Sequence, residues 1–114
     1  MVTRVLVIYG EKDIFTLAND MFKDIHFDEA SEWGQAEQRL QDHTYGVVVI
    51  ASLRRPFTSS EAALRISVLS PESLIFLMTA DLHVNNPLPG FDKLIHKIDD
   101  GFSGLVSAIR LSVG

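Results

Sequence analysis

The chain carries four continuous apolar runs, at about residues 4–8, 46–51, 74–79 and 93–97, and each is rich in valine, isoleucine or leucine. Strands that are buried on both faces of a parallel sheet have this composition, because neither side of such a strand meets water. The runs therefore predict four buried strands of a parallel sheet.

The segments between the runs place apolar residues at the i, i+3, i+4 spacing of amphipathic helices. Such stripes cover residues 14–22, 33–40, 62–69 and 102–113, and Pro71 is expected to end the third helix. Candidate N-terminal caps are Asp13 or the residues just before it, Ser31 with Glu32 in the first turn, and Ser59 or Ser60. The alternation of strand and helix predicts helices on both faces of the sheet.

A weaker strand is predicted near residues 25–30, where apolar and polar positions alternate. Alternation of this kind is typical of an edge strand that is half exposed. The usual order for a five-stranded sheet of this class is 2-1-3-4-5. Its functional crevice lies outside the carboxyl ends of strands 1 and 3.

One segment departs from the alternation. Residues 80–90 contain two prolines, two asparagines and a glycine, which leave little room for a regular helix. We expect the helix before the last strand, the fourth in a sheet of this type, to be short or missing.

Composition is consistent with one compact domain over residues 1–114, since 46% hydrophobic residues are enough to fill a single core. A net charge of −5 without clustered lysine and arginine argues against nucleic acid or an anionic membrane as partner. No cysteine is present, which excludes disulfides and cysteine zinc sites. No apolar stretch reaches the roughly 20 residues that span a bilayer, and no signal peptide is apparent, so a cytoplasmic domain is expected.

The ends of the apolar runs carry the residues that matter for function. The first run leads into Tyr9-Gly10-Glu11, the second into Ala51-Ser52, the third into Thr79 and the fourth into Lys97. This layout resembles the receiver domain of bacterial response regulators. The resemblance implies a CheY-like, flavodoxin-like three-layer α/β sandwich. In that family the first strand ends in paired acids that hold Mg²⁺, the third in the aspartate that accepts phosphate, the fourth in threonine or serine, and the fifth in lysine.

The acids are missing from the positions that matter most. Tyr9 and Gly10 stand where the resemblance places the acid pair, and neither supplies the carboxylate oxygen that Mg²⁺ usually requires. Ala51 stands at the phosphoacceptor position and has no nucleophile. The chain therefore resembles a pseudo-receiver that has lost its phosphorylation chemistry.

An alternative alignment, shifted by one residue, makes Ser52 the phosphoacceptor, with Glu11 and Asp13 as displaced acids. The position of Pro56 suits this shift, whereas the alternation of the third strand favours Ala51. A hydroxyl without a nearby base or metal is a poor acceptor of a phosphoryl group.

Thr79 and Lys97 match the hydroxyl and ammonium positions of the family, and for both a structural role at the strand ends is favoured over anion binding. Ile98 replaces the proline that usually follows the lysine, so the loop after the last strand is expected to be remodelled. The emptied crevice around Tyr9, Ala51, Thr79 and Lys97 leaves a sensor of small ligands, such as nucleotides, as a further possibility.

Other chemistry has little support. The histidines lie on separate predicted elements without ligand spacing, so no metal site is expected: His26, His43, His83 and His96. Gly10 is the only glycine near the first turn, which argues against a phosphate-binding loop and a bound cofactor. No nucleophile with a paired base can be located, so the chain is not predicted to be an enzyme.

Loss of phosphorylation leaves the surface of the domain as its means of action. In the receiver family the face built from the fourth helix, fifth strand and fifth helix commonly mediates dimerisation and contact with output domains. The resemblance implies such an interface over residues 91–113, and some of its apolar residues should be exposed if the fourth helix is reduced. The candidate interface residues are Phe91, Leu94, Phe102, Leu105, Ile109 and Leu111.

The leading hypothesis is a phosphorylation-independent regulatory module that binds a protein partner or an attached output domain. A symmetric homodimer is the simplest assembly. We expect the domain to be the N-terminal part of a longer signalling or transcription regulator.

Overall fold

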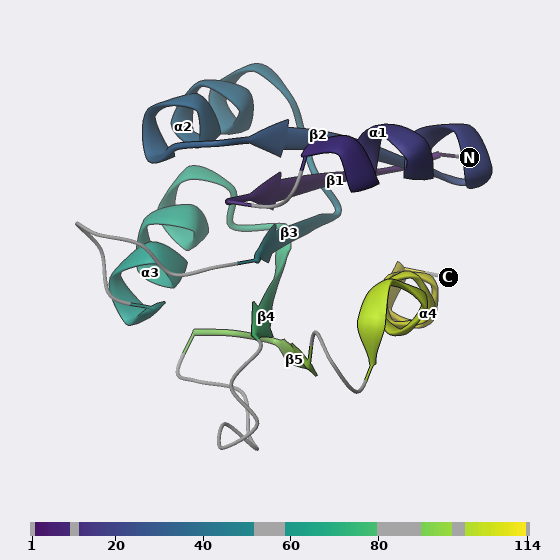
Figure 1. Cartoon of the computed structure of the whole chain (residues 1–114). Helices are drawn as coiled ribbons and strands as arrows, with labels where there is room; N and C mark the ends of the chain where they lie inside the picture. Colours follow the sequence, from purple (N-terminus) through teal and green to yellow (C-terminus); the bar gives the residue numbers. More distant parts are fainter. Residues whose placement is uncertain (1, 10–11, 52–58, 80–89, 97–99, 114) are drawn as a thin grey trace.

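A computed structural model of the chain shows a five-stranded parallel sheet between two layers of helices (Figure 1). It describes residues 2–9, 12–51, 59–79, 90–96 and 100–113. The strands are β1 (Thr3–Ile8), β2 (Ile25–Ala30), β3 (Val47–Ile50), β4 (Leu74–Thr79) and β5 (Lys93–His96). The helices in the described ranges are α1 (Lys12–Met21), α2 (Trp33–Asp42), α3 (Ser59–Leu69) and α4 (Gly101–Val113).

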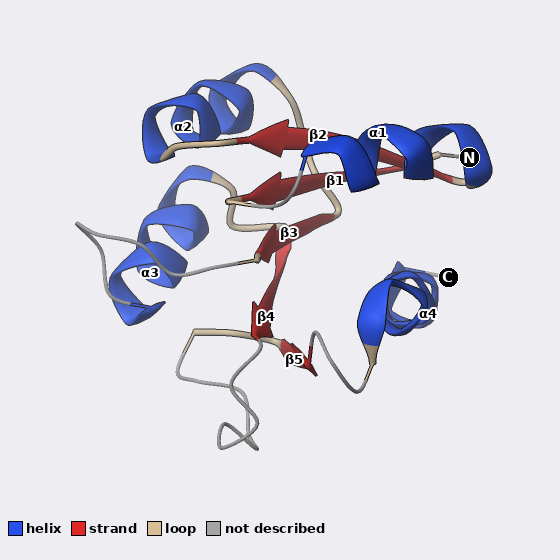
Figure 2. Ribbon diagram, viewed as in Figure 1, coloured by secondary structure: helices blue, strands red, loops and turns tan. Residues whose placement is uncertain are grey.

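The strand order is β2-β1-β3-β4-β5, which confirms the order predicted from the sequence. Helices α2 and α3 cover one face of the sheet, and α1 and α4 cover the other (Figure 2). The four apolar runs form β1, β3, β4 and β5, and the alternating segment forms the edge strand β2. The sequence pattern thus predicted both the elements and their arrangement.

Successive side chains of the inner strands enter two hydrophobic cores, one on each face of the sheet. Val5 and Val7 of β1 pack with Ile109 on the face of α1 and α4. Leu6 and Ile8 of the same strand pack on the face of α2 and α3. These four strand residues are completely buried, which explains why the run has no polar position.

The outer edge of β2 is protected by side chains from two helices. Asn19 of α1 donates from Nδ2 to the carbonyl of Phe27 over 2.9 Å and accepts from the amide of Phe27 over 2.6 Å. Arg39 of α2 donates from Nε to the carbonyl of Glu29 over 2.9 Å. These bonds occupy backbone groups that would otherwise be open to another strand.

The start of α2 differs from the prediction. Its N-cap residue is Glu32, with φ −148° and ψ 165° and no side-chain capping bond, so Ser31 lies one residue too early to be the cap. The amide and hydroxyl of Ser31 both donate to Oε1 of Gln35, over 2.9 Å each. Three other cap candidates lie inside the first turns of α1 and α3 rather than before them: Asp13, Ser59 and Ser60.

The C-terminal half agrees with the remaining predictions where it is described. Helix α3 ends at Leu69, two residues before Pro71, and α4 covers the predicted stripe. The helix expected to be short or missing falls on residues 80–89, outside the described residues. Gly90, just before β5, has φ +91°, and a Cβ there would lie 2.8 Å from Cβ of Ala63 in α3, so only glycine allows this approach. Within the described ranges, none of the helices combines the length and apolar character needed to cross a membrane.

Candidate functional site

The carboxyl ends of β1 and β3 lie side by side at one edge of the sheet. Ile8 is paired with Ile50, and the amide of Ala51 donates to the carbonyl of Ile8 over 2.9 Å. Tyr9 and Ala51, the residues that follow these two strands, are therefore neighbours. In open sheets of this order a ligand site forms outside this edge.

Tyr9 leaves β1 in the left-handed backbone region, with φ 61°. Its amide donates to the carbonyl of Ala30 over 2.9 Å, and its half-buried side chain packs against the core beneath α2 and α3. A residue with a Cβ pays about 1–2 kcal/mol for this conformation, so packing and the amide bond must offset that cost. The position thus carries an aromatic ring directed to the core instead of a carboxylate.

Ala51 continues the alternation of β3 on the face of α1 and α4. Val47 and Val49 belong to the core on that face, and Ala51 joins the same core with 3% of its surface exposed. A buried methyl group has no lone pair and cannot attack phosphorus. The residue at this strand end is therefore chemically inert.

Thr79 and His96 lie beside each other at the ends of β4 and β5. They are register partners, and both are half-buried. Nδ1 of His96 is buried and has no hydrogen-bond partner among the described residues, while the amide of His96 donates to Oδ2 of Asp100 over 2.8 Å. Neither spacing nor a motif marks His96 in the sequence, so it is not distinguishable there from the other three histidines.

Several predicted site residues lie outside the described residues, so their predicted roles are untested: Gly10, Glu11, Ser52 and Lys97. Asp13 is helical, in the first turn of α1. The structure therefore brings together Tyr9, Ala51 and Thr79 at one edge of the sheet. Among the described residues, no three histidine, aspartate or glutamate side chains converge as they would around a metal ion.

The predicted interface residues are mostly part of the protein's own core. Phe91 is 8% exposed, and Leu105 and Ile109 are completely buried, so these three side chains are covered by their own chain. The interface over residues 91–113 stays a prediction. Leu94 and Phe102 are half-buried and pack against the two cores. The physical reason is that β5 and α4 bury these side chains within the same chain.

Phe102 belongs to an aromatic cluster that joins α1, β2 and α4. Its ring centroid lies 5.6 Å from that of Phe15, 5.7 Å from that of Phe27 and 5.9 Å from that of Phe22. In contrast, Leu111 on α4 is 80% exposed. Leu111 is thus the one candidate of the six whose side chain is largely exposed.

A charged cluster lies at the opposite end of the sheet from Tyr9 and Ala51. Asp28 of β2 accepts hydrogen bonds from Arg4 and from the hydroxyl of Tyr45, each over 2.7 Å, and contacts Nε2 of His26 at 3.0 Å. Burial raises the pKa of Asp28, yet the three hydrogen bonds outweigh burial and hold that pKa below its ordinary value. Burial and the adjacent carboxylate raise the pKa of Tyr45, so its phenol remains a donor. This cluster joins β1, β2 and the segment before β3.

The sequence did not predict this cluster. Tyr45 and Asp28 are separated by 17 positions, and Arg4 and Asp28 by 24. The polar positions of β2 were the only signal, since His26 and Asp28 share one face of an alternating strand.

Neither a family model nor a curated protein matches the sequence. Among solved structures, the chain is similar to the response regulator TrrA from Thermotoga maritima in complex with Mg²⁺-BeF, with 21% identity and a TM-score of 0.76, over 98% of this chain and 100% of that one. It is also similar to a CheY-like receiver domain protein from Methanospirillum hungatei, with 13% identity and a TM-score of 0.70, over 98% and 97% of the two chains.

A further similar structure is the adenylate cyclase from Rhodopirellula baltica, with 16% identity and a TM-score of 0.76, over 99% of this chain and 88% of that one. At these identities the similarity establishes the fold alone. The chain has the CheY-like flavodoxin fold, and its structural neighbours include response-regulator receiver domains of signal transduction.

Proposed function

We propose that this chain is a pseudo-receiver, a regulatory module that acts through protein contacts without being phosphorylated. The observation that carries the proposal is Ala51, a buried methyl group at the end of β3, where the resemblance to receiver domains places the phosphoacceptor. Tyr9 supports it from the adjacent strand, because its ring occupies the end of β1, where that family holds Mg²⁺ with acids. Nucleophile and metal ligand are thus replaced together.

The test is exposure of the ¹⁵N-labelled protein to beryllofluoride and Mg²⁺, followed by amide chemical shifts. TrrA is a positive control, since it forms a complex with Mg²⁺-BeF. We expect no shift at the amides of Ala51 and Thr79 in this chain. Large shifts there, removed by Ser52→Ala, would replace the proposal with the alternative in which Ser52 accepts phosphate beside Glu11 and Asp13.

In this proposal residues 1–114 form one non-enzymatic domain that regulates signal transduction or transcription through a protein partner. TrrA is similar in fold and forms a complex with the histidine kinase ThkA, which supports a protein partner for this chain. Homodimerisation belongs to the same proposal. Light scattering after size-exclusion chromatography tests it, and a monomer at all accessible concentrations would refute it.

A second candidate is a small-ligand sensor at the same edge of the sheet. The observation that favours it is His96, which lies beside Thr79 and whose buried Nδ1 has no hydrogen-bond partner in the part of the chain that the structure describes. Buried polar atoms are ordinarily paired, so a ligand atom would satisfy this one. A thermal-shift screen of nucleotides, including cyclic dinucleotides, tests this candidate, and His96→Leu should remove any stabilisation.

A further inference from the structure

Helix α3 is apolar on two opposite faces. Ala63 and Ile66 are buried against the sheet, whereas Leu64 and Val68 point outward and are 65% and 74% exposed. An amphipathic surface helix normally presents polar residues to solvent, so two exposed apolar side chains one turn apart depart from that pattern. The outer face of α3 therefore has the character of a contact surface.

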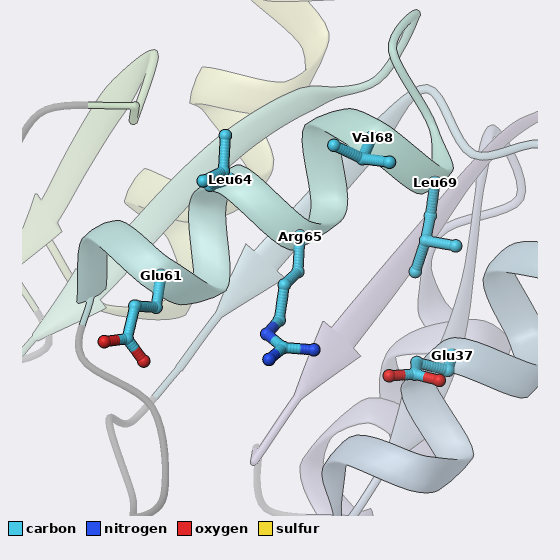
Figure 3. A pocket seen from close by; sticks show the side chains of 6 residues that line it. All are labelled: Glu37, Glu61, Leu64, Arg65, Val68 and Leu69. Carbon is cyan, nitrogen blue, oxygen red and sulfur yellow. The ribbon is translucent and has the colours of Figure 1, made fainter.

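A groove runs along this face between α2 and α3. Figure 3 shows Arg65 extending from α3 toward the side on which Glu37 of α2 lies, with Glu61 near the start of α3, while Leu64 and Val68 stand on the outer side of α3. The groove has a volume of about 430 Å³ and its lining is mostly apolar. We call it the α2–α3 groove, and its lining residues are Glu37, Glu61, Leu64, Arg65, Val68 and Leu69.

Among the described residues that line the α2–α3 groove, acids outnumber bases. Glu37 and Glu61 lie there with one described base, Arg65. Glu72 is exposed just beyond the end of α3. Glu37 also accepts a hydrogen bond from Nε1 of Trp33, which leaves further acceptor sites on its carboxylate. The whole chain carries a net charge of −5, so a second copy would bring acidic rims together.

We propose that the α2–α3 groove docks a basic amphipathic helix of a partner protein. Apolar side chains of that helix, spaced i and i+4, would cover Leu64 and Val68, and its lysines or arginines would lie against Glu37 and Glu61. The inference rests on the proposed function only in that the domain acts through protein contacts. Its test uses no phosphate analogue, so either proposal can fail without the other.

A synthetic amphipathic peptide of leucine and lysine, with leucines at i, i+3, i+4 and i+7, is the probe for this groove. Trp33 is the only tryptophan of the chain and contacts Glu37, so its fluorescence reports occupation of the groove. Amide chemical shifts locate the bound peptide independently. We expect shifts along α3 and α2, and weaker binding by about tenfold in the double variant Leu64→Ser, Val68→Ser.

The matched control is the double variant Leu17→Ser, Met21→Ser. These residues form a second exposed i, i+4 apolar pair, 63% and 72% exposed on α1, and their loss should leave peptide affinity unchanged. Equal weakening by both double variants, or shifts centred on α1, would overturn the proposal. Tight binding of the same peptide with glutamate in place of lysine would also overturn it. So would a protein dimer that the Leu64→Ser, Val68→Ser variant abolishes, because such a dimer would assign this face to a second copy of the chain.

Discussion

At the residue scale, the hydroxyl of Tyr45 is a single buried group on which a charged cluster depends. The Tyr45 side chain is completely buried and donates to Oδ2 of Asp28 over 2.7 Å. Tyr45→Phe removes only that donor, and we expect the free energy of unfolding to fall by about 1–3 kcal/mol. Urea unfolding at pH 7 measures the loss, and a double-mutant cycle with Asp28→Asn isolates the hydrogen bond. Additive effects of the two substitutions would contradict the assigned bond.

Asp28 makes the free energy of unfolding depend on pH in the acid range. Its pKa is lower in the folded protein than in the unfolded chain, so its contribution is present above the unfolded value near 3.8 and is lost as pH falls through the folded value. We expect Asp28→Asn to destabilise the protein at pH 7 and to flatten the decline of stability below about pH 4. Urea midpoints between neutral pH and pH 2.5 check this.

Asp24 is the matched control for that experiment. Its hydrogen bond to Arg110 also lowers its pKa, but the Asp24 side chain is 48% exposed, against 12% for Asp28. Solvent screens the exposed Asp24–Arg110 pair. Asp24→Asn should therefore change the decline of stability at acid pH much less than Asp28→Asn does. An equal effect of the two substitutions would show that burial of Asp28 is unimportant.

At the element scale, β2 depends on Asn19 to close its outer edge. Asn19→Leu would leave the amide and carbonyl of Phe27 without their partners, and we expect a loss of about 1–3 kcal/mol. The opened edge should also favour association through strand pairing. Gln41→Leu, an amide replaced by leucine at an exposed position of α2, is the control. Thermal unfolding and light scattering measure both effects, and identical behaviour of the two variants would refute the role of Asn19.

The regular elements were predictable because their signals are local. The run from Val5 to Ile8 is apolar throughout, and the alternation of β2 reflects one buried and one open side. The start of α2 was not predictable to the residue, because Ser31 and Glu32 both suit a helix start and Gln35 decides between them. Element types thus follow from periodicity, whereas caps depend on individual side-chain bonds.

The candidate site was predictable in part for the same reason. The residues after β1 and β3 follow from the strand ends, so Tyr9 and Ala51 could be placed beside each other before their geometry was known. The burial of Leu105 and the exposure of Leu111 could not be predicted. Both residues lie on one apolar helix, and only tertiary packing makes one buried and the other exposed. Periodicity identifies an apolar face but does not tell a core from an interface.

At the scale of the whole molecule, the sheet is shared by two cores that lie on its opposite faces. Ile109 of α4 belongs to one core, and Trp33 of α2 packs against the other. Val5 and Leu6 are consecutive residues of β1 yet enter different cores, so one core cannot be lost without disturbing the backbone of the other. The two layers should therefore unfold as one unit.

Ile109→Ala tests this cooperativity. Removal of a completely buried isoleucine should cost about 2–5 kcal/mol, and Leu111→Ala, on the same helix but 80% exposed, should cost almost nothing. Because Trp33 reports only the α2 and α3 side, its fluorescence transition in urea should shift to lower concentration together with the far-ultraviolet circular dichroism. A shift in circular dichroism with an unchanged Trp33 transition would mean that the layers unfold separately. In that case the α2–α3 groove would belong to a unit whose stability does not depend on the α1 and α4 layer.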